Sequence, residues 1–327
     1  MVESRRLGNT GLKVGAVGVG CMTFGWRADA AETEAIVTDA LDIGINLFDT
    51  SVSYGRGVSE TMLGQALKRS GRRKDAFIAT KFGGAATAGA TREEIGNSRR
   101  NLMRQCELSL RRLKTDWIDL LQIHNFSADV PLEETLGGLD QLVREGKVRY
   151  IGCSNFTGGQ LIEALGCADR LKFCSITSHQ ARFNLLDRRA ETDVMPIACG
   201  HGVANLIYSP LAEGLLTGKY CAAEAFPAGS RFAVASPSNN YGARLTIEVD
   251  GAIKSLNAAA VSRSMPLWQL ALSWILSNSA VCCVLLGPSN RDQVKTLPDI
   301  ADIQIDSELA ALVNSLNPPG LCLLPNS

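Results

Sequence analysis

The chain has 327 residues, of which 46% are hydrophobic and 20% are charged, so it can bury a large core and is neither disordered nor fibrous. Its 33 basic and 33 acidic side chains cancel, which argues against a surface for nucleic acids or a basic patch for membranes. No apolar run reaches the roughly 18 residues of a transmembrane helix, and the first residues lack the apolar core of a signal peptide. We therefore expect a cytoplasmic protein that binds neither nucleic acid nor membrane.

The cysteines and histidines indicate a reducing compartment and no metal site. The ten cysteines are scattered without a CxxC pair, and several lie in apolar runs, where cysteine behaves as a small hydrophobic residue. A chain of this length does not need disulfides to be stable. Only three histidines are present, and they form no HExxH motif or Cys/His cluster. We expect mostly buried free thiols and no bound metal.

Eight short apolar runs alternate with amphipathic stretches along the chain. The apolar runs have the length and the Val, Ile and Leu content of strands that are buried on both faces. These predicted strands cover residues 14–20, 46–50, 77–81, 117–124, 148–154, 174–180, 204–209 and 281–287. The stretches with helical spacing cover residues 30–43, 59–68, 98–113, 131–144, 157–168, 187–199, 266–276 and 290–297.

Eight repeats of a strand followed by a helix predict the α/β class and a closed parallel (β/α)8 TIM barrel. The alternative is an open dinucleotide-binding sheet, which should carry a GxGxxG motif after its first strand, and residues 18–23 do not match that motif. Residues 5–13, with a turn at Gly8-Asn9, are typical of a β-hairpin that precedes the first barrel strand. We expect this hairpin to plug the bottom of the barrel.

A connection rich in Gly, Ala, Pro, Ser and Asn follows the seventh predicted strand and covers residues 211–245. A loop of that length in a compact domain usually serves as a lid or as a binding loop. We expect residues 1–327 to form a single barrel domain, with residues 305–327 as an appended tail.

Polar residues close the predicted strands, at the end of this barrel where catalytic residues are found. The second strand ends in Asp49, with Tyr54 five residues later, the third ends in Lys81, and the fourth ends in His124. A buried lysine cation favours the phenolate of a nearby tyrosine, so we expect Lys81 to lower the pKa of Tyr54. Asp49 can supply the counter-charge of the lysine, and His124 can donate a hydrogen bond to a substrate oxygen. This combination suits proton delivery to a carbonyl group that is being reduced.

The remaining strand ends are typical of a nucleotide-binding site. Ser154, Asn155 and Gln180 can hold a carboxamide with directed hydrogen bonds, and Tyr208 offers a flat face to a heteroaromatic ring. Candidates that would let backbone and cations approach phosphate groups are Gly214, Gly218, Lys219, Arg231 and Arg291.

These residues lie in motifs that resemble the aldo-keto reductase superfamily over residues 6–297. The most specific motifs are GINLFDT followed by YG and SE in residues 44–60, IATKFG in 78–83 and DLLQIH in 119–124. Residues 152–156, 180–188 and 208–220 resemble the cofactor-binding segments of that superfamily. The resemblance implies a TIM barrel that uses NADPH to reduce aldehydes or ketones reversibly. The GLLTGKY run is similar to the bacterial branch that also resembles potassium-channel β subunits.

The resemblance implies roles for individual residues. Tyr54 is the implied proton donor, Asp49 and Lys81 tune it, and His124 orients the carbonyl. The implied cofactor contacts are Met22, Asp49, Ser154, Asn155, Gln180, Tyr208, Ser209, Pro210, Leu211, Gly214, Lys219, Arg231, Gly287, Ser289, Arg291 and Gln293.

The choice of coenzyme depends on the 2′-phosphate of NADPH, which a guanidinium group can bind. We expect NADPH to be preferred, with Arg291 near Ser289 as the cation for that phosphate. The family usually continues with Glu-Asn where this chain has Thr296-Leu297, so NADH stays open as the coenzyme.

Several functions fit the sequence besides carbonyl reduction. One alternative is an NADPH-binding sensor or regulatory module with slow turnover. Another is a reductase of sugar nucleotides or enoyl compounds in secondary metabolism. A third is an aldolase that forms a Schiff base through Lys81, which would leave the amides and the aromatic ring of the later strands without a role. The expected partner is a small carbonyl compound, and both a monomer and an oligomer are compatible with the sequence.

Overall fold

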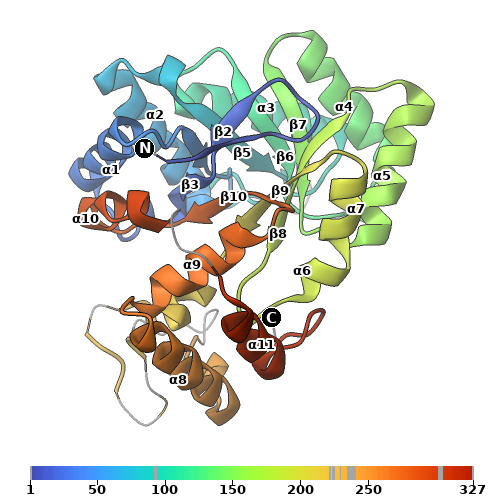
Figure 1. The fold of residues 1–327 in the computed structure, drawn as a ribbon. Helices are drawn as coiled ribbons and strands as arrows, with labels where there is room; N and C mark the ends of the chain where they lie inside the picture. The colour runs from blue at the N-terminus through green and yellow to red at the C-terminus, as the bar shows by residue number, and fades with distance from the viewer. Residues whose placement is uncertain are drawn as a thin grey trace.

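The computed structural model describes residues 2–91, 94–220, 222, 225–228, 230–233, 241–300 and 305–325. Eight parallel strands form a closed barrel in the order β10-β3-β4-β5-β6-β7-β8-β9, and helices surround it (Figure 1). The strands are β3 (Val17–Gly20), β4 (Leu47–Asp49), β5 (Phe77–Phe82), β6 (Ile118–Ile123), β7 (Val148–Ser154), β8 (Ile176–Arg182), β9 (Ala204–Tyr208) and β10 (Val281–Leu286). The predicted fold class is confirmed.

An antiparallel hairpin of β1 (Ser4–Arg6) and β2 (Lys13–Gly15) precedes the barrel, as predicted. Leu7 and Val14 are fully buried in one cluster with side chains of the barrel interior, so the hairpin plugs the barrel. The predicted start of the first barrel strand at residue 14 is wrong. Val14 pairs with the first hairpin strand, and the amide of Gly15 donates to the Asn46 side chain at 2.9 Å, so the barrel strand begins three residues later.

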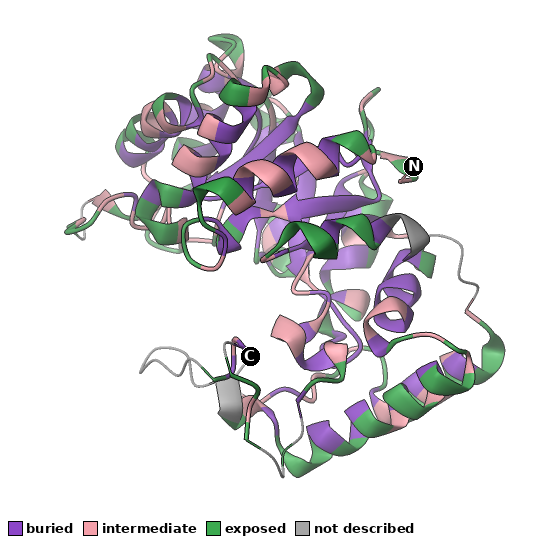
Figure 2. Cartoon of the chain, turned by 90° about the vertical axis from the view of Figure 1, so that its left-hand side faces the viewer, coloured by how far each residue is buried: buried purple, intermediate pink, exposed green. Residues whose placement is uncertain are grey.

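The helices are α1 (Ala30–Asp42), α2 (Val58–Ser70), α3 (Arg99–Leu113), α4 (Leu132–Arg144), α5 (Gly158–Leu171), α6 (Arg189–Thr192), α7 (Val194–Gly200), α8 (Ile247–Ser262), α9 (Leu267–Ser277), α10 (Arg291–Lys295) and α11 (Ser307–Leu316). Helices that surround the barrel turn their buried faces inward, whereas α8 lies away from the strands and packs against α9 and α11 (Figure 2). The side chains of Asp29, Ser98 and Thr157 cap α1, α3 and α5 by accepting backbone N–H groups of the first turn.

Two helices differ from the prediction. The stretch 187–199 is divided at Asp193 into α6 and α7, because Asp193 leaves the helical conformation and its carboxylate accepts the amide of Gly158. Helix α8 was not expected, since its alternation of small and polar residues gives little periodicity. It begins at the cap residue Thr246, directly after the predicted long loop.

The long connection after β9 contains two short 3-10 segments, Ala212–Thr217 and Tyr241–Arg244. Residues 221, 223, 224, 229 and 234–240 of this connection lie outside the described residues.

The final segment packs against the chain that follows β8. The amide of Leu323 donates to the carbonyl of Leu186 at 2.8 Å, and the Arg188 guanidinium donates to the carbonyl of Asn317 at 2.7 Å. The expected tail 305–327 is therefore docked through its described part, and residues 326 and 327 lie outside the described ranges.

Six of the nine cysteines that the structure describes are buried free thiols. Cys221 lies outside the described residues. In the described part of the chain, none of the helices combines the length and the apolarity that crossing a bilayer requires.

Burial of His179 makes the fold sensitive to acid. This β8 residue is 1% exposed, its Nε2 accepts the amide of Phe156 at 3.3 Å, and burial lowers its pKa to about 4. The unfolded chain, with an ordinary pKa near 6.5, binds the proton first as the pH falls. The stability linked to neutral His179, about 3 kcal/mol, is therefore present above pH 6.5 and is lost as the pH falls through 4.

We predict that His179→Gln flattens the fall in unfolding free energy between pH 6.5 and 4, because glutamine keeps an acceptor and does not titrate. Urea unfolding at several pH values measures this slope. The control is His201→Gln, which changes an exposed histidine and should keep the wild-type slope. An H179Q slope equal to that of wild type would contradict the prediction.

Candidate active site

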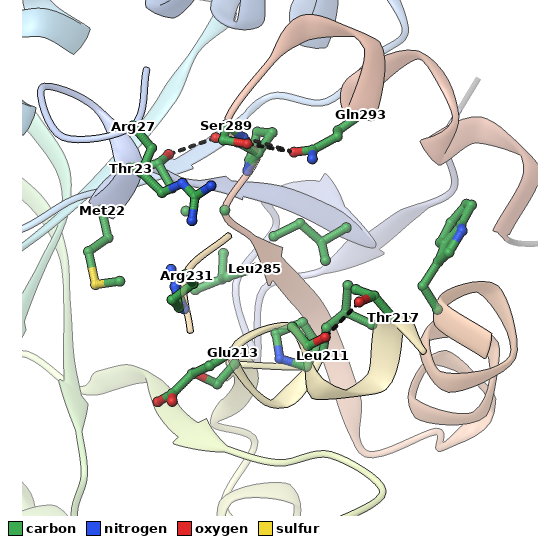
Figure 3. Close-up of a pocket in the computed structure, with 18 of the residues that line it drawn as sticks. Met22, Thr23, Arg27, Leu211, Glu213, Thr217, Arg231, Leu285, Ser289 and Gln293 are labelled. Atoms are coloured by element: carbon green, nitrogen blue, oxygen red, sulfur yellow. Dashed lines mark hydrogen bonds between the residues drawn. The ribbon is translucent and has the colours of Figure 1, made fainter. Parts of the chain in front are cut away.

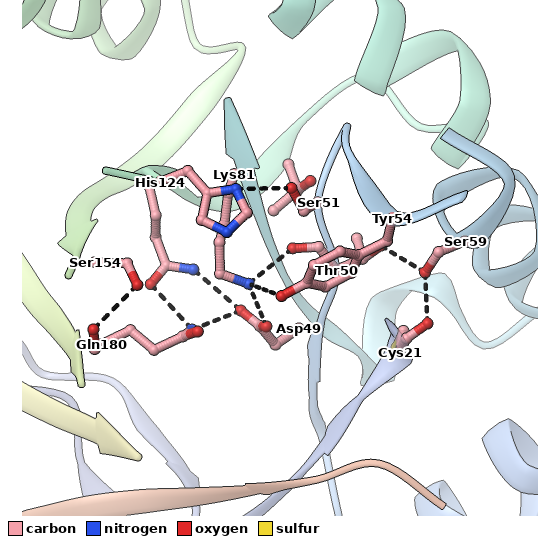
Figure 4. A network of polar contacts seen from close by, with 12 residues as sticks. Cys21, Asp49, Thr50, Ser51, Tyr54, Ser59, Lys81, His124, Ser154 and Gln180 are labelled. Carbon is pink, nitrogen blue, oxygen red and sulfur yellow. Dashed lines mark hydrogen bonds and ion pairs between the residues drawn. The ribbon is translucent and has the colours of Figure 1, made fainter. Parts of the chain in front are cut away.

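Three neighbouring strands and one turn bring the predicted catalytic residues together. Asp49 ends β4, Lys81 lies near the end of β5, and His124 directly follows β6. Tyr54 begins a short 3-10 turn after β4. Because parallel strands end at the same side of the barrel, these side chains converge (Figure 4).

Lys81 is the centre of the cluster. Its side chain is 1% exposed, and its ammonium group forms an ion pair with Asp49 and donates to the carbonyl of Thr50 at 3.1 Å and to the hydroxyl of Tyr54 at 3.2 Å. These three partners use all three donors of the ammonium group. Burial alone would lower the pKa of Lys81, but the Asp49 carboxylate and Tyr54 outweigh it and hold the pKa above its ordinary value. Lys81 is therefore a cation.

The second oxygen of Asp49 receives two amide donors. Gln122 Nε2 lies 3.1 Å from Asp49 Oδ2, and Gln180 Nε2 lies 2.8 Å from the same atom. All three side chains are buried. The carboxylate is thus fixed between one cation and two amides, which keeps a buried charge fully hydrogen-bonded.

The pKa of Tyr54 is shifted in the direction opposite to the one expected. Burial raises it above its ordinary value, the nearby Lys81 cation lowers it, and the Asp49 carboxylate raises it again. The prediction of a lowered pKa is wrong for this state of the protein, because desolvation exceeds the effect of a cation that is already paired with Asp49. The phenol consequently keeps its proton.

His124 is neutral near pH 7. Burial and the Lys81 cation lower its pKa to about 4. The ring lies edge-on to Tyr54, with 6.1 Å between ring centroids, and its Nδ1 is 3.3 Å from Ser51 Oγ. The ring can therefore donate one hydrogen bond and accept one.

A cavity of about 700 Å³ extends from Asp49 and Tyr54 to the residues after β10. Figure 3 shows it between the loop with Thr23 and Arg27 and the segment with Glu213 and Thr217. The predicted cofactor residues that line it are Met22, Asp49, Tyr208, Ser209, Pro210, Leu211, Gly214, Lys219, Arg231, Gly287, Ser289 and Gln293.

Three other predicted cofactor residues, Ser154, Asn155 and Gln180, do not line the cavity but bond to residues in or near its wall. The hydroxyl of Ser154 donates to the Gln180 carbonyl at 3.0 Å, and the Gln180 amide is directed to Asp49. Asn155 donates to the carbonyl of His124 at 3.0 Å and accepts from the Tyr208 hydroxyl at 2.8 Å. Asn155 therefore holds the cavity residue Tyr208 in place.

Arg291 is not brought to the cavity. Its guanidinium forms two hydrogen bonds of 2.9 Å to the carboxylate of Asp39 on α1. The sequence prediction placed this arginine at a phosphate because it lies beside Ser289, but the acidic partner on the adjacent helix turns it away.

Sequence reasoning missed Arg27, Glu213 and Trp268, which all line the cavity. Arg27 and Arg231 both lie over the ring of Trp26, with guanidinium carbons 5.9 and 5.5 Å from its centroid. The position of Arg27 in the loop after the first barrel strand is the signal that could have found it.

Glu213 and Gly214 both have a positive φ, and the larger angle at the second position explains its glycine. Gly214 has a φ of +108°, which favours glycine, and Glu213 adopts a φ of +61°. The Glu213 carboxylate accepts from Arg182 at 2.8 Å and forms an ion pair with Arg244. Two arginines thus balance the negative charge that this residue brings to the cavity wall.

No cluster of three His, Cys, Asp or Glu side chains suited to a metal ion occurs among the residues that the structure describes.

The buried ion pair yields a stability prediction. Lys81→Met leaves Asp49 buried without its cation, so we expect the free energy of unfolding to fall by about 3–5 kcal/mol. The double variant Asp49→Asn/Lys81→Met removes both charges and should recover most of this loss. Urea unfolding compares the two variants, and equal stability of the single and double variants would show that the two glutamine amides satisfy Asp49 without Lys81.

Comparison with known proteins agrees with this geometry. The family model described as "Aldo/keto reductase family" matches residues 16–318. A probable voltage-gated potassium channel subunit beta of Arabidopsis thaliana is 34% identical over 92% of both chains. An uncharacterized oxidoreductase, YrpG, of Bacillus subtilis (strain 168) is 32% identical over 98% of this chain and 97% of its own. The aldo-keto reductase yakc of Schizosaccharomyces pombe, with NADP(+) in its name, is 31% identical over 84% of this chain and 80% of its own.

The family match covers most of the chain, and the relatives exceed 30% identity over most of its length. The resemblance seen in the motifs is therefore confirmed, and family membership supports an oxidoreductase. The chain belongs to the aldo/keto reductase family.

Proposed function

We propose that the protein is an NAD(P)H-dependent oxidoreductase that reduces an aldehyde or ketone, with Tyr54 as the proton donor. The observation that carries this proposal is the buried chain from Asp49 through Lys81 to the Tyr54 hydroxyl, which ends at a large cavity. The name of the fission yeast relative, which contains NADP(+), supports the same coenzyme.

The cavity residues fit a nicotinamide dinucleotide. Arg27, Lys219 and Arg231 provide cations for phosphate groups, and Trp268 provides an apolar wall for a ring. Tyr208 provides a second flat face near the proton donor. When bound, the reduced nicotinamide supplies the hydride for the substrate carbon.

The protein residues deliver the proton. Neutral His124 donates a hydrogen bond to the carbonyl oxygen and orients it. As the carbon accepts the hydride, negative charge grows on this oxygen, and Tyr54 transfers its phenolic proton to it. The Lys81 cation, 3.2 Å from the phenol oxygen, stabilises the phenolate that remains. The alcohol leaves, and the phenolate regains a proton from solvent.

Two observations weigh on the alternatives. The Arabidopsis relative is named as a channel subunit, which favours an NADPH-binding sensor with slow turnover as a second candidate. Lys81 has a raised pKa and three bonded donors, which counts against an aldolase, because such a lysine needs a lowered pKa. If this protein reduces sugar nucleotides or enoyl compounds instead, the same cavity serves and only the substrate differs. Oxidation of NADPH and NADH with a panel of aldehydes, ketones and keto-sugars separates these functions.

The proton donor is tested by Tyr54→Phe, which removes one oxygen and keeps the packing. We expect the rate of aldehyde reduction to fall by about 10²–10⁴-fold, the usual contribution of a general acid. The dissociation constant of NADPH should change little. Tyr150→Phe is the matched control, because Tyr150 packs against Phe77 at the other end of the barrel. A Y54F enzyme with near wild-type turnover would remove Tyr54 from the mechanism.

The phosphate contacts are tested with three arginine variants. Arg27→Ala and Arg231→Ala should each raise the dissociation constant of NADPH by about tenfold or more, since a hydrogen bond to a charged group is lost. Arg291→Ala should have a much smaller effect, because Arg291 is paired with Asp39. Fluorescence titration with NADPH and NADH measures both constants, and a larger effect of R291A on NADPH than of R27A or R231A would reverse this assignment.

A further inference from the structure

Two serines, Ser53 and Ser51, form a short chain of hydrogen bonds that ends at Nδ1 of His124. Ser51, two residues after β4, is fully buried. Its Oγ accepts the amide of Ser53 at 3.2 Å, lies 2.9 Å from Ser53 Oγ, and lies 3.3 Å from His124 Nδ1 (Figure 4). Neither serine belongs to the four catalytic residues described above.

The proton of neutral His124 can reside on either ring nitrogen. A neutral imidazole donates from one nitrogen and accepts at the other. A carbonyl oxygen only accepts, so His124 can orient it only when the nitrogen that faces the substrate carries the proton. With Nδ1 directed to Ser51, that nitrogen is Nε2, on the side of Lys81 and Tyr54 (Figure 4).

The charge of Lys81 favours the opposite tautomer. A cation nearby attracts a nitrogen lone pair, and Lys81 is close enough to act on the titration of His124. Tyr54, on the same side, already accepts a hydrogen bond from Lys81. A donor at Nδ1 is therefore needed to keep the proton on Nε2.

Ser51 can be that donor. Its oxygen accepts the Ser53 amide and can also accept the Ser53 hydroxyl, which leaves its own proton for His124. We propose that Ser51 is a positioning residue whose hydroxyl donates to Nδ1 and holds His124 as the Nε2–H tautomer, with a donor directed to the substrate oxygen. The use of this donor rests on the proposed function, whereas the tautomer is a property of the protein alone.

The tautomer can be read by ¹⁵N NMR of histidine-labelled protein, because the nitrogen chemical shift separates protonated from unprotonated ring nitrogens. The chain has only three histidines, and His179→Gln and His201→Gln assign the spectrum. We expect wild-type His124 to carry its proton on Nε2. In Ser51→Ala the ratio of the two tautomers should shift toward Nδ1–H by about two- to tenfold, the effect of one lost hydrogen bond.

Two further variants and the other histidines provide the controls. Ser51→Thr keeps the hydroxyl and should restore the wild-type signal. Ser53→Ala leaves the Ser51 hydroxyl and the Ser53 amide in place and should keep the Nε2–H tautomer. The His179 and His201 signals report in the same spectra that each variant is folded. A wild-type Nδ1–H tautomer, or an unchanged tautomer in S51A, would overturn the proposal.

A kinetic measurement tests the use of the donor. With a good aldehyde, S51A should lose about two- to tenfold in kcat, while the dissociation constant of NADPH stays unchanged. A shifted tautomer with unchanged kcat, in an enzyme that Y54F inactivates, would overturn the role of Nε2–H toward the substrate. Full turnover by Y54F would overturn the proposed function instead, and the spectra would still decide whether Ser51 sets the tautomer.

Discussion

The ion pair of Lys81 and Asp49 is the interaction on which the site depends. A buried ammonium group is stable only if its charge is paired and all its donors are used, and the barrel provides both conditions. Asp49 and Thr50 come from the end of β4, and Tyr54 comes from the turn that follows. Gln122 and Gln180 from more distant strands then bond the remaining oxygen of Asp49. The closed sheet thus surrounds the ion pair with hydrogen-bond partners from β6, β8 and the segment after β4, and one of these partners is the phenol of Tyr54.

Burial also sets the protonation state of each group near that charge. Desolvation keeps the proton on Tyr54 and keeps His124 neutral, while Asp49 keeps Lys81 charged. A general acid must hold its proton until the reaction needs it, and a hydrogen-bond donor to a carbonyl must not be in the wrong tautomer. The low polarity of the barrel interior therefore sets the protonation states that the proposed carbonyl reduction requires. The same low polarity makes the loss of one partner costly.

Much of the fold and the catalytic cluster could be predicted, because both depend on local signals. Alternating buried strands and helices define a parallel barrel, and a polar residue at the end of a strand lies at the carboxyl-terminal end of that barrel. The sequence did not reveal contacts whose partner is distant along the chain. Arg291 is held by Asp39, which precedes it by 252 residues, and the Gln180 amide is drawn to Asp49. The pKa of Tyr54 depends on how completely the fold excludes water, and a sequence motif contains no information on that. Helix α8 lacks a clear period and so gave no signal.

The closing seam of the barrel has a consequence for synthesis in the cell. Strand β3, which begins at Val17, pairs with β4 on one side and with β10, which ends at Leu286, on the other. Arg5 of the hairpin likewise donates to the carbonyls of Leu276 and Val281. At typical rates of translation the ribosome needs on the order of 10–50 s to make the chain between them. During that interval one edge of β3 has no strand beside it, and such an edge can pair with another chain. The barrel therefore cannot close until β10, near the end of the chain, has been synthesised.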